Sequence, residues 1–150
     1  MIRRNQKAVA TVLLCANLLF IWVNSLLPAS VSAAFSRWVK ELLGFVLSGI
    51  GAELQGDGPI RKLAHFLEFC SLGVLLGWRL SMNLKTKWIL PTLLSGASVA
   101  CVDEFLQHFS PGRAPRITDV GIDTSGVLLG ISLLALGKYI VSKKRNKNGG

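Results

Sequence analysis

Four long apolar stretches dominate the pattern of this chain. Residues 8–27 hold no ionisable side chain apart from Cys15, and Pro28 follows directly. An α-helix rises ~1.5 Å per residue, so about twenty residues cover the ~30 Å of a bilayer core. Three further stretches of similar length lie at about 63–80, 88–106 and 120–141. The pattern predicts an all-α integral membrane protein with four transmembrane helices, which form a single domain over residues 1–150.

The loop between the first two stretches carries a different pattern. Apolar residues between Phe35 and Ile50 recur at i, i+3, i+4 and i+7, whereas polar residues such as Arg37 and Lys40 take the opposite face. This spacing is typical of an amphipathic helix that lies on the membrane surface. A lid packed over the mouth of the bundle would show the same spacing. We expect an interfacial helix in this outer loop.

The charged residues divide unevenly between the two sides of the predicted membrane. The N-terminus, the turn 79–87 and the C-terminal end hold eleven of the 17 Lys and Arg residues and none of the eight acidic residues. Cytoplasmic segments are rich in Lys and Arg, so both termini are expected in the cytoplasm. The basic tail, residues 142–150, suits contact with anionic lipid or a role in topology alone. The net charge of +9 comes without a nucleic-acid-binding motif, and no nucleic-acid partner is predicted.

Ionisable residues also occur within or beside the apolar stretches, and the predicted topology places them at the outer end. Such residues are costly in lipid, so they usually face a cavity and have partners. Pairs three or four residues apart, such as Glu104 and His108, share a helix face. The pattern predicts a polar pocket at the outer membrane face. Its candidate ligand-binding residues are Lys62, His65, Glu68, Asp103, Glu104, Gln107, Arg113, Asp119 and Asp123.

Three roles are open for this pocket. Its residues could satisfy one another and fix the helix register. The cations could instead bind phosphate or carboxylate oxygens, which match the fork of an arginine. A third role is a metal or acid–base site for hydrolysis or transfer. Its ligands would come from His65, Glu68, Glu104 and Asp119. The chain has no metal-binding or nucleophile motif, so no cofactor and no bound metal are predicted.

One pentapeptide, Gly-Val-Leu-Leu-Gly, occurs twice. It spans Gly73 to Gly77 and Gly126 to Gly130, on two helices predicted to run in the same direction. Small residues four apart let helix backbones approach closely in lipid. These four glycines are therefore predicted helix-packing residues, although apolar sequence can repeat by chance. Whether the chain forms a homo-oligomer is left open.

Three motifs occupy residues 62–69, 104–113 and 119–130. They read K-x-x-H-F-x-x-F, E-x-x-Q-x-F-x-P-G-R and D-x-x-x-D-x-x-G-x-x-x-G. Over about residues 61–130 the chain resembles the VanZ-like family of small bacterial membrane proteins. It departs from the family pattern at Asp123, where the family usually has asparagine, and the acid adds a negative charge.

The resemblance implies a multi-pass protein of a bacterial plasma membrane with a role in the cell envelope. The namesake of the family is associated with reduced susceptibility to teicoplanin, a lipid-tailed glycopeptide. We therefore expect the pocket to bind an amphiphile headgroup, either of an envelope lipid or of a lipoglycopeptide such as teicoplanin, and so to lower antibiotic susceptibility. The expected partners are membrane lipids and a lipoglycopeptide or a lipid-linked envelope precursor. The alternative is a membrane-embedded hydrolase or transferase that acts on a lipid-linked phosphate or sugar.

Overall fold

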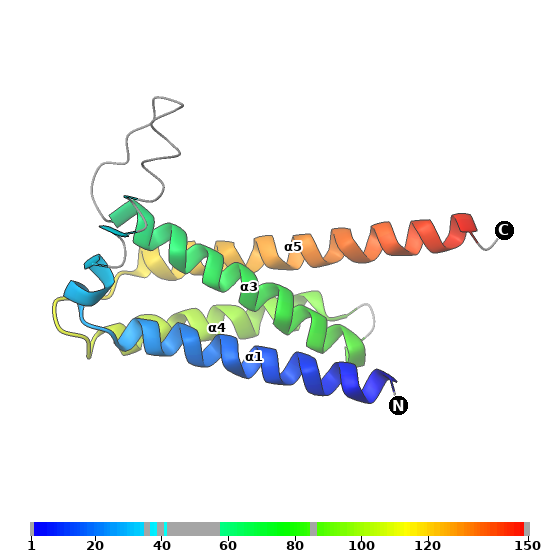
Figure 1. Ribbon diagram of the computed structural model, residues 1–150, viewed down its shortest axis with the longest axis horizontal. Helices are drawn as coiled ribbons and strands as arrows, with labels where there is room; N and C mark the ends of the chain where they lie inside the picture. The colour runs from blue at the N-terminus through cyan, green and yellow to red at the C-terminus, as the bar shows by residue number, and fades with distance from the viewer. Residues whose placement is uncertain (1, 35–36, 39–40, 42–57, 85–86, 149–150) are drawn as a thin grey trace, which may run out of the picture.

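The computed structural model of the chain describes residues 2–34, 37–38, 41, 58–84 and 87–148. Four long helices make up most of it: α1 (Ile2–Leu26), α3 (Gly58–Leu84), α4 (Ile89–Gln107) and α5 (Ile117–Asn148). They lie along one common direction, and α1 and α4 run opposite to α3 and α5 (Figure 1). The described residues contain no strand. The predicted all-α fold is confirmed.

Each of these helices is long and apolar enough to cross a membrane. The candidate spans are Arg4–Leu26, Pro59–Leu84, Ile89–Gln107 and Ile117–Lys147. Large apolar side chains such as Val12, Leu94 and Leu136 are exposed along the bundle, where lipid tails would cover them. The four predicted spans are confirmed, but α5 continues beyond the predicted 120–141. A helix satisfies its own backbone groups, so polar residues can extend it past the apolar stretch that identifies it.

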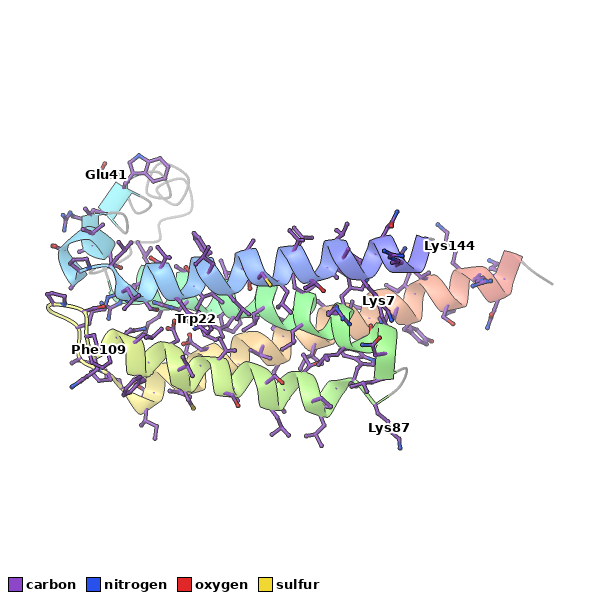
Figure 2. The ribbon with its side chains drawn as sticks, turned by 90° about the horizontal axis from the view of Figure 1, so that it is seen from below. Lys7, Trp22, Glu41, Lys87, Phe109 and Lys144 are labelled. Carbon is purple, nitrogen blue, oxygen red and sulfur yellow. The ribbon has the colours of Figure 1, made fainter. Side chains whose placement is uncertain are left out.

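The two ends of the bundle differ in character. Both termini lie at the same end (Figure 1), and Lys7, Lys87 and Lys144 lie toward it (Figure 2). Phe109 lies at the opposite end, which we call the loop end because residues 108–116 join α4 to α5 there. Which end faces the cytoplasm stays a prediction. Most of the predicted interfacial helix, 35–50, lies outside the described residues, and 29–34 form a short helical segment before it.

Helices α3 and α4 each contact the other three long helices, and the most extensive contact is between α3 and α5. Phe69 and Leu72 of α3 have no exposed surface and pack with Ile21 of α1, Ala100 of α4 and Val127 of α5. This core occupies the middle of the bundle. Along α3, α4 and α5, the buried polar residues of the candidate pocket lie on the loop-end side of these core residues.

Three glycines bring the backbones of α3 and α5 into direct contact. A Cβ atom on Gly73 would lie 2.5 Å from the Val127 carbonyl oxygen. A Cβ atom on Gly126 or Gly130 would overlap the carbonyl oxygen of a residue on α3. Gly77 instead faces the side chains of Trp88 and Leu134. The two Gly-x-x-x-Gly segments thus meet along the parallel α3–α5 pair and set its close spacing.

Candidate functional site

The nine candidate pocket residues come together at the loop end. Helices α3 and α5 begin there and α4 ends there (Figure 1), so residues far apart in sequence converge. Five of the nine are buried even though they are polar or charged. These are His65, Asp103, Glu104, Gln107 and Asp123.

Asp103 lies at the centre of this cluster and has no exposed surface. The Ser25 hydroxyl donates a hydrogen bond to Asp103 Oδ1 at 2.6 Å. Gln107 Nε2 donates to the other carboxylate oxygen, Oδ2, at 3.1 Å. His65 Nδ1 lies 3.9 Å from the same Oδ2. Neutral donors therefore orient this carboxylate, and they come from both α1 and α4.

Helix α1 also supplies polar residues to the site, a contribution that was not predicted from the sequence. Asn24 Nδ2 donates to Glu68 Oε1 at 2.7 Å, and Asn17 Nδ2 donates to the Ser71 hydroxyl at 2.7 Å. Asn17, Asn24 and Ser25 are at positions i, i+7 and i+8 of an otherwise apolar helix, which is the spacing of one face. That spacing was the signal available in the sequence.

The two cationic side chains of the site, Lys62 and Arg113, have different interaction partners. Lys62 Nζ lies 3.6 Å from Asp119 Oδ1, near the surface. Arg113 is half-buried, and its Nη2 donates to the Asn24 carbonyl oxygen at 3.1 Å. Its Nε and Nη1 atoms are buried and have no hydrogen-bond partner. Burial lowers the pKa of the Arg113 guanidinium, and the charge of Arg61 acts in the same direction. A further anion beside Arg113 would therefore stabilise its charge.

The loop that carries Arg113 is fixed at several points. Gly112 has a φ of 76°, a conformation that favours glycine and turns the chain. The Pro111 carbonyl oxygen accepts a hydrogen bond from Ala29 N at 3.1 Å, which ties the loop to the segment after α1. Glu104 Oε1 accepts a hydrogen bond from the Arg116 backbone N–H, whereas Glu104 Oε2 is buried without a partner. The loop therefore holds Arg113 and Arg116 in defined places.

Three buried groups from three helices meet in the interior of the cluster. His65, Asp103 and Asp123 each offer one potential metal-ligand atom, and these atoms lie within 4.8 Å of one another. The four ligands considered from sequence were His65, Glu68, Glu104 and Asp119. In the described part of the chain, the structure groups His65 with Asp103 and Asp123 instead. Spacing along one helix does not reveal the distances between helices, so this grouping was not predictable.

Two hollows adjoin the polar cluster. One is a cavity of about 10 Å³ beside His65 and Asp123. The other is a groove of about 600 Å³ between α4 and the start of α5. Its walls are mostly apolar, with polar groups at the loop end. The groove is lined by Cys101, Glu104, Phe105, His108, Pro115, Arg116, Ile117 and Val120.

Replacing Ser25 with alanine tests the central hydrogen bond. The change leaves Asp103 Oδ1 without its donor in a site closed to water, which costs about 1–3 kcal/mol. We expect the midpoint of thermal unfolding in detergent to fall measurably. Ser98→Ala is the matched control, because Ser98 is exposed on α4 and bonds only to its own helix at Leu94 O. Equal unfolding midpoints for the two variants would contradict this account.

The four spanning helices and the buried polar cluster define a multi-pass helical membrane protein with an enclosed polar site at one end. The family model for VanZ/LLP1 matches residues 6–138, so the chain belongs to the VanZ/LLP1 family. The match includes α1, and thus the polar residues that α1 contributes. Neither a curated protein nor a solved structure matches the chain significantly.

Proposed function

We propose that this protein binds the anionic headgroup of an envelope amphiphile at the loop end of the bundle. The observation that carries the proposal is the state of Arg113. Two of its guanidinium nitrogens are buried without an acceptor, although a buried polar group almost always has a partner. Phosphate and carboxylate oxygens are the acceptors that an arginine prefers.

A groove that Glu104 and Arg116 line at the loop end favours an amphiphile over a free anion, although Arg113 itself does not line it. The groove is open along the surface and has a volume of about 600 Å³. Phe105, Ile117 and Val120 provide apolar walls for an acyl chain, and Arg116 lies at the polar end beside Glu104. A molecule with its tail along α4 and α5 would bring its headgroup to the loop that carries Arg113. Lys62, held by Asp119, adds positive charge at the same end.

Two sources could supply such a ligand, a membrane lipid or a lipid-tailed glycopeptide. Membership of the VanZ/LLP1 family makes both relevant, since the namesake of the VanZ-like family is associated with reduced susceptibility to teicoplanin. We infer a location in a bacterial plasma membrane with the loop end outward. Binding of the antibiotic there would reduce the amount that reaches its target and lower susceptibility.

Growth inhibition of a susceptible Gram-positive host tests this function. Cells carrying empty vector, wild type, Glu104→Gln or Glu41→Gln would be challenged with teicoplanin and with vancomycin. We expect wild type and Glu41→Gln to raise the inhibitory concentration of teicoplanin several-fold and to leave that of vancomycin unchanged. Glu104→Gln should not raise the inhibitory concentration of teicoplanin, even when the same amount of protein is inserted in the membrane. Glu41 is the matched control because it is exposed and outside the cluster.

The other outcomes of this assay are equally informative. If wild type changes neither threshold, the resemblance to the resistance protein is one of scaffold only, and membrane lipids become the ligands to test. If Glu104→Gln raises the teicoplanin threshold as far as wild type does, the polar site is not the functional one.

A second candidate function is hydrolysis or transfer at a lipid-linked phosphate. The meeting of His65, Asp103 and Asp123 favours it, since such groups can activate water. In hydrolysis of a lipid pyrophosphate, the water oxygen would bond to the terminal phosphorus, and the bond from that phosphorus to the bridging oxygen would break and leave a lipid monophosphate. Release of inorganic phosphate from a lipid pyrophosphate by the purified protein, lost in Asp103→Asn, would decide for this function over binding alone.

A further inference from the structure

We propose that His65, Asp103 and Asp123 bind one divalent first-row metal ion, of the Zn²⁺ or Mn²⁺ type, in the interior of the bundle. The three ligands come from α3, α4 and α5, and their candidate ligand atoms lie within 4.8 Å of one another. Atoms that bind one ion at ~2.1 Å lie at most ~4.2 Å apart. Three ligand atoms in tetrahedral geometry lie ~3.4 Å apart, so each atom moves inward by up to about 0.8 Å to complete the coordination.

The histidine provides an observation independent of the carboxylates. His65 is only 8% exposed, and its Nδ1 atom is buried without a hydrogen-bond partner. This atom lies 3.9 Å from Asp103 Oδ2 and 3.7 Å from Glu68 Oε2, which is itself unpartnered. Both separations are too long for hydrogen bonds, and the one between Nδ1 and Asp103 Oδ2 suits two ligands of one ion.

The charge of the cluster also favours a bound metal ion. Asp103 and Asp123 are 0% and 2% exposed. Among the described residues, no Lys or Arg nitrogen lies within 4.0 Å of either carboxylate. Two buried carboxylates without a paired cation are strongly unfavourable. One divalent ion neutralises both.

The ligand set and its surroundings indicate the kind of ion. One imidazole and two carboxylates suit Zn²⁺ or Mn²⁺ better than Ca²⁺ or Mg²⁺, which prefer oxygen ligands alone. The cavity of about 10 Å³ beside His65 and Asp123 is close to the size of one water molecule, which would complete the coordination. Hydrogen bonds from Ser25 and Gln107 orient the Asp103 carboxylate, as groups behind a metal ligand usually do.

The metal site stands apart from the proposed headgroup function. Neither Arg113 nor the apolar groove walls contribute a ligand. Metal binding is therefore measurable without any lipid or antibiotic. Failure of one proposal leaves the other intact.

The test uses the purified full-length chain in detergent, stripped with a chelator and then titrated with Zn²⁺, Mn²⁺ or Mg²⁺. Elemental analysis should find one Zn²⁺ or Mn²⁺ per chain after desalting. At a free ion concentration of 100 times Kd, the midpoint of thermal unfolding should rise by about 5–10 °C, because the ion binds the folded state. Mg²⁺ at the same concentration should give a much smaller shift.

Matched variants locate the ion. Asp123→Asn should weaken Zn²⁺ or Mn²⁺ binding at least ~10-fold, whereas Glu41→Gln, which neutralises an exposed carboxylate outside the cluster, should leave Kd within ~3-fold. The VanZ-like pattern has asparagine at position 123, so we expect this variant to fold, and its unfolding midpoint in chelator provides the check. His65→Asn and the exposed His108→Asn form a second pair, with loss of binding expected only for the first.

Two results would overturn the site. The first is a wild-type protein that retains neither Zn²⁺ nor Mn²⁺ and whose unfolding midpoint neither ion changes, which would mean that the two carboxylates share protons instead. The second is a folded Asp123→Asn variant that binds the ions as tightly as wild type does.

Discussion

Replacing Gly130 with alanine is expected to destabilise the bundle more than any other single-methyl addition on α5. The new Cβ atom would overlap the Cys70 carbonyl oxygen and crowd Val74 N at 2.8 Å and Gly73 Cα at 3.0 Å. All three are backbone atoms, which cannot move aside as a flexible side chain can. Overpacking typically costs about 1–3 kcal/mol, and we expect the upper end of that range. The measurement is the midpoint of thermal unfolding in detergent, together with the yield of monodisperse protein.

The control for this prediction is Gly137→Ala, the same change two turns later on the same helix. A Cβ atom there meets nothing within 4 Å. Alanine favours helix over glycine by up to about 1 kcal/mol, so this variant should be as stable as wild type or slightly more so. If Gly130→Ala unfolds at the same temperature as Gly137→Ala, the close α3–α5 contact does not hold the bundle together.

Replacing Arg113 with alanine should remove most of the affinity for an anionic amphiphile while the protein still inserts and folds. The guanidinium has two unpartnered buried nitrogens, and a hydrogen bond to a charged group contributes about 1.5–3 kcal/mol. Loss of one such bond weakens binding by about 10- to 100-fold. Titration of the purified protein with phosphatidylglycerol, followed by native mass spectrometry, gives the ratio of dissociation constants.

Two comparison variants separate the geometry of Arg113 from its charge. Arg79→Ala removes a cation whose Nε donates to Thr11 in an exposed contact away from the pocket, and it should leave the affinity unchanged. Arg113→Lys keeps the positive charge but loses the planar set of donors, so an intermediate affinity is expected. An Arg113→Ala variant with wild-type affinity would show that this arginine is structural.

The sequence predicts the four spans well because a long continuous apolar stretch can satisfy its backbone hydrogen bonds in lipid by forming a helix. It also predicts that polar residues of α3, α4 and α5 share one end, since alternating helix directions place the starts of α3 and α5 beside the end of α4. The part played by α1 was missed. Asn17, Asn24 and Ser25 are neutral, and neutral polar residues do not stand out in an apolar helix as charged residues do.

The distances inside the site depend on helix rotation and spacing. The rotation of α5 against α3 follows from the contact of Gly126 and Gly130 with the α3 backbone, and it turns Asp123 toward His65. The sequence contains these glycines, but it does not specify which face of the partner helix they meet. The grouping of His65 with Asp103 and Asp123 therefore emerges only in three dimensions.

Direct competition between two lipids tests the central claim that the loop end binds an anionic headgroup. Purified wild-type protein would be equilibrated with equal amounts of phosphatidylglycerol and phosphatidylcholine carrying identical acyl chains, and the bound lipid identified by native mass spectrometry. We predict that phosphatidylglycerol is bound in at least ~10-fold excess, and that Arg113→Ala abolishes the excess. Equal occupancy by the two lipids in the wild-type protein would contradict the account, because the groove would then bind acyl chains without regard to the headgroup.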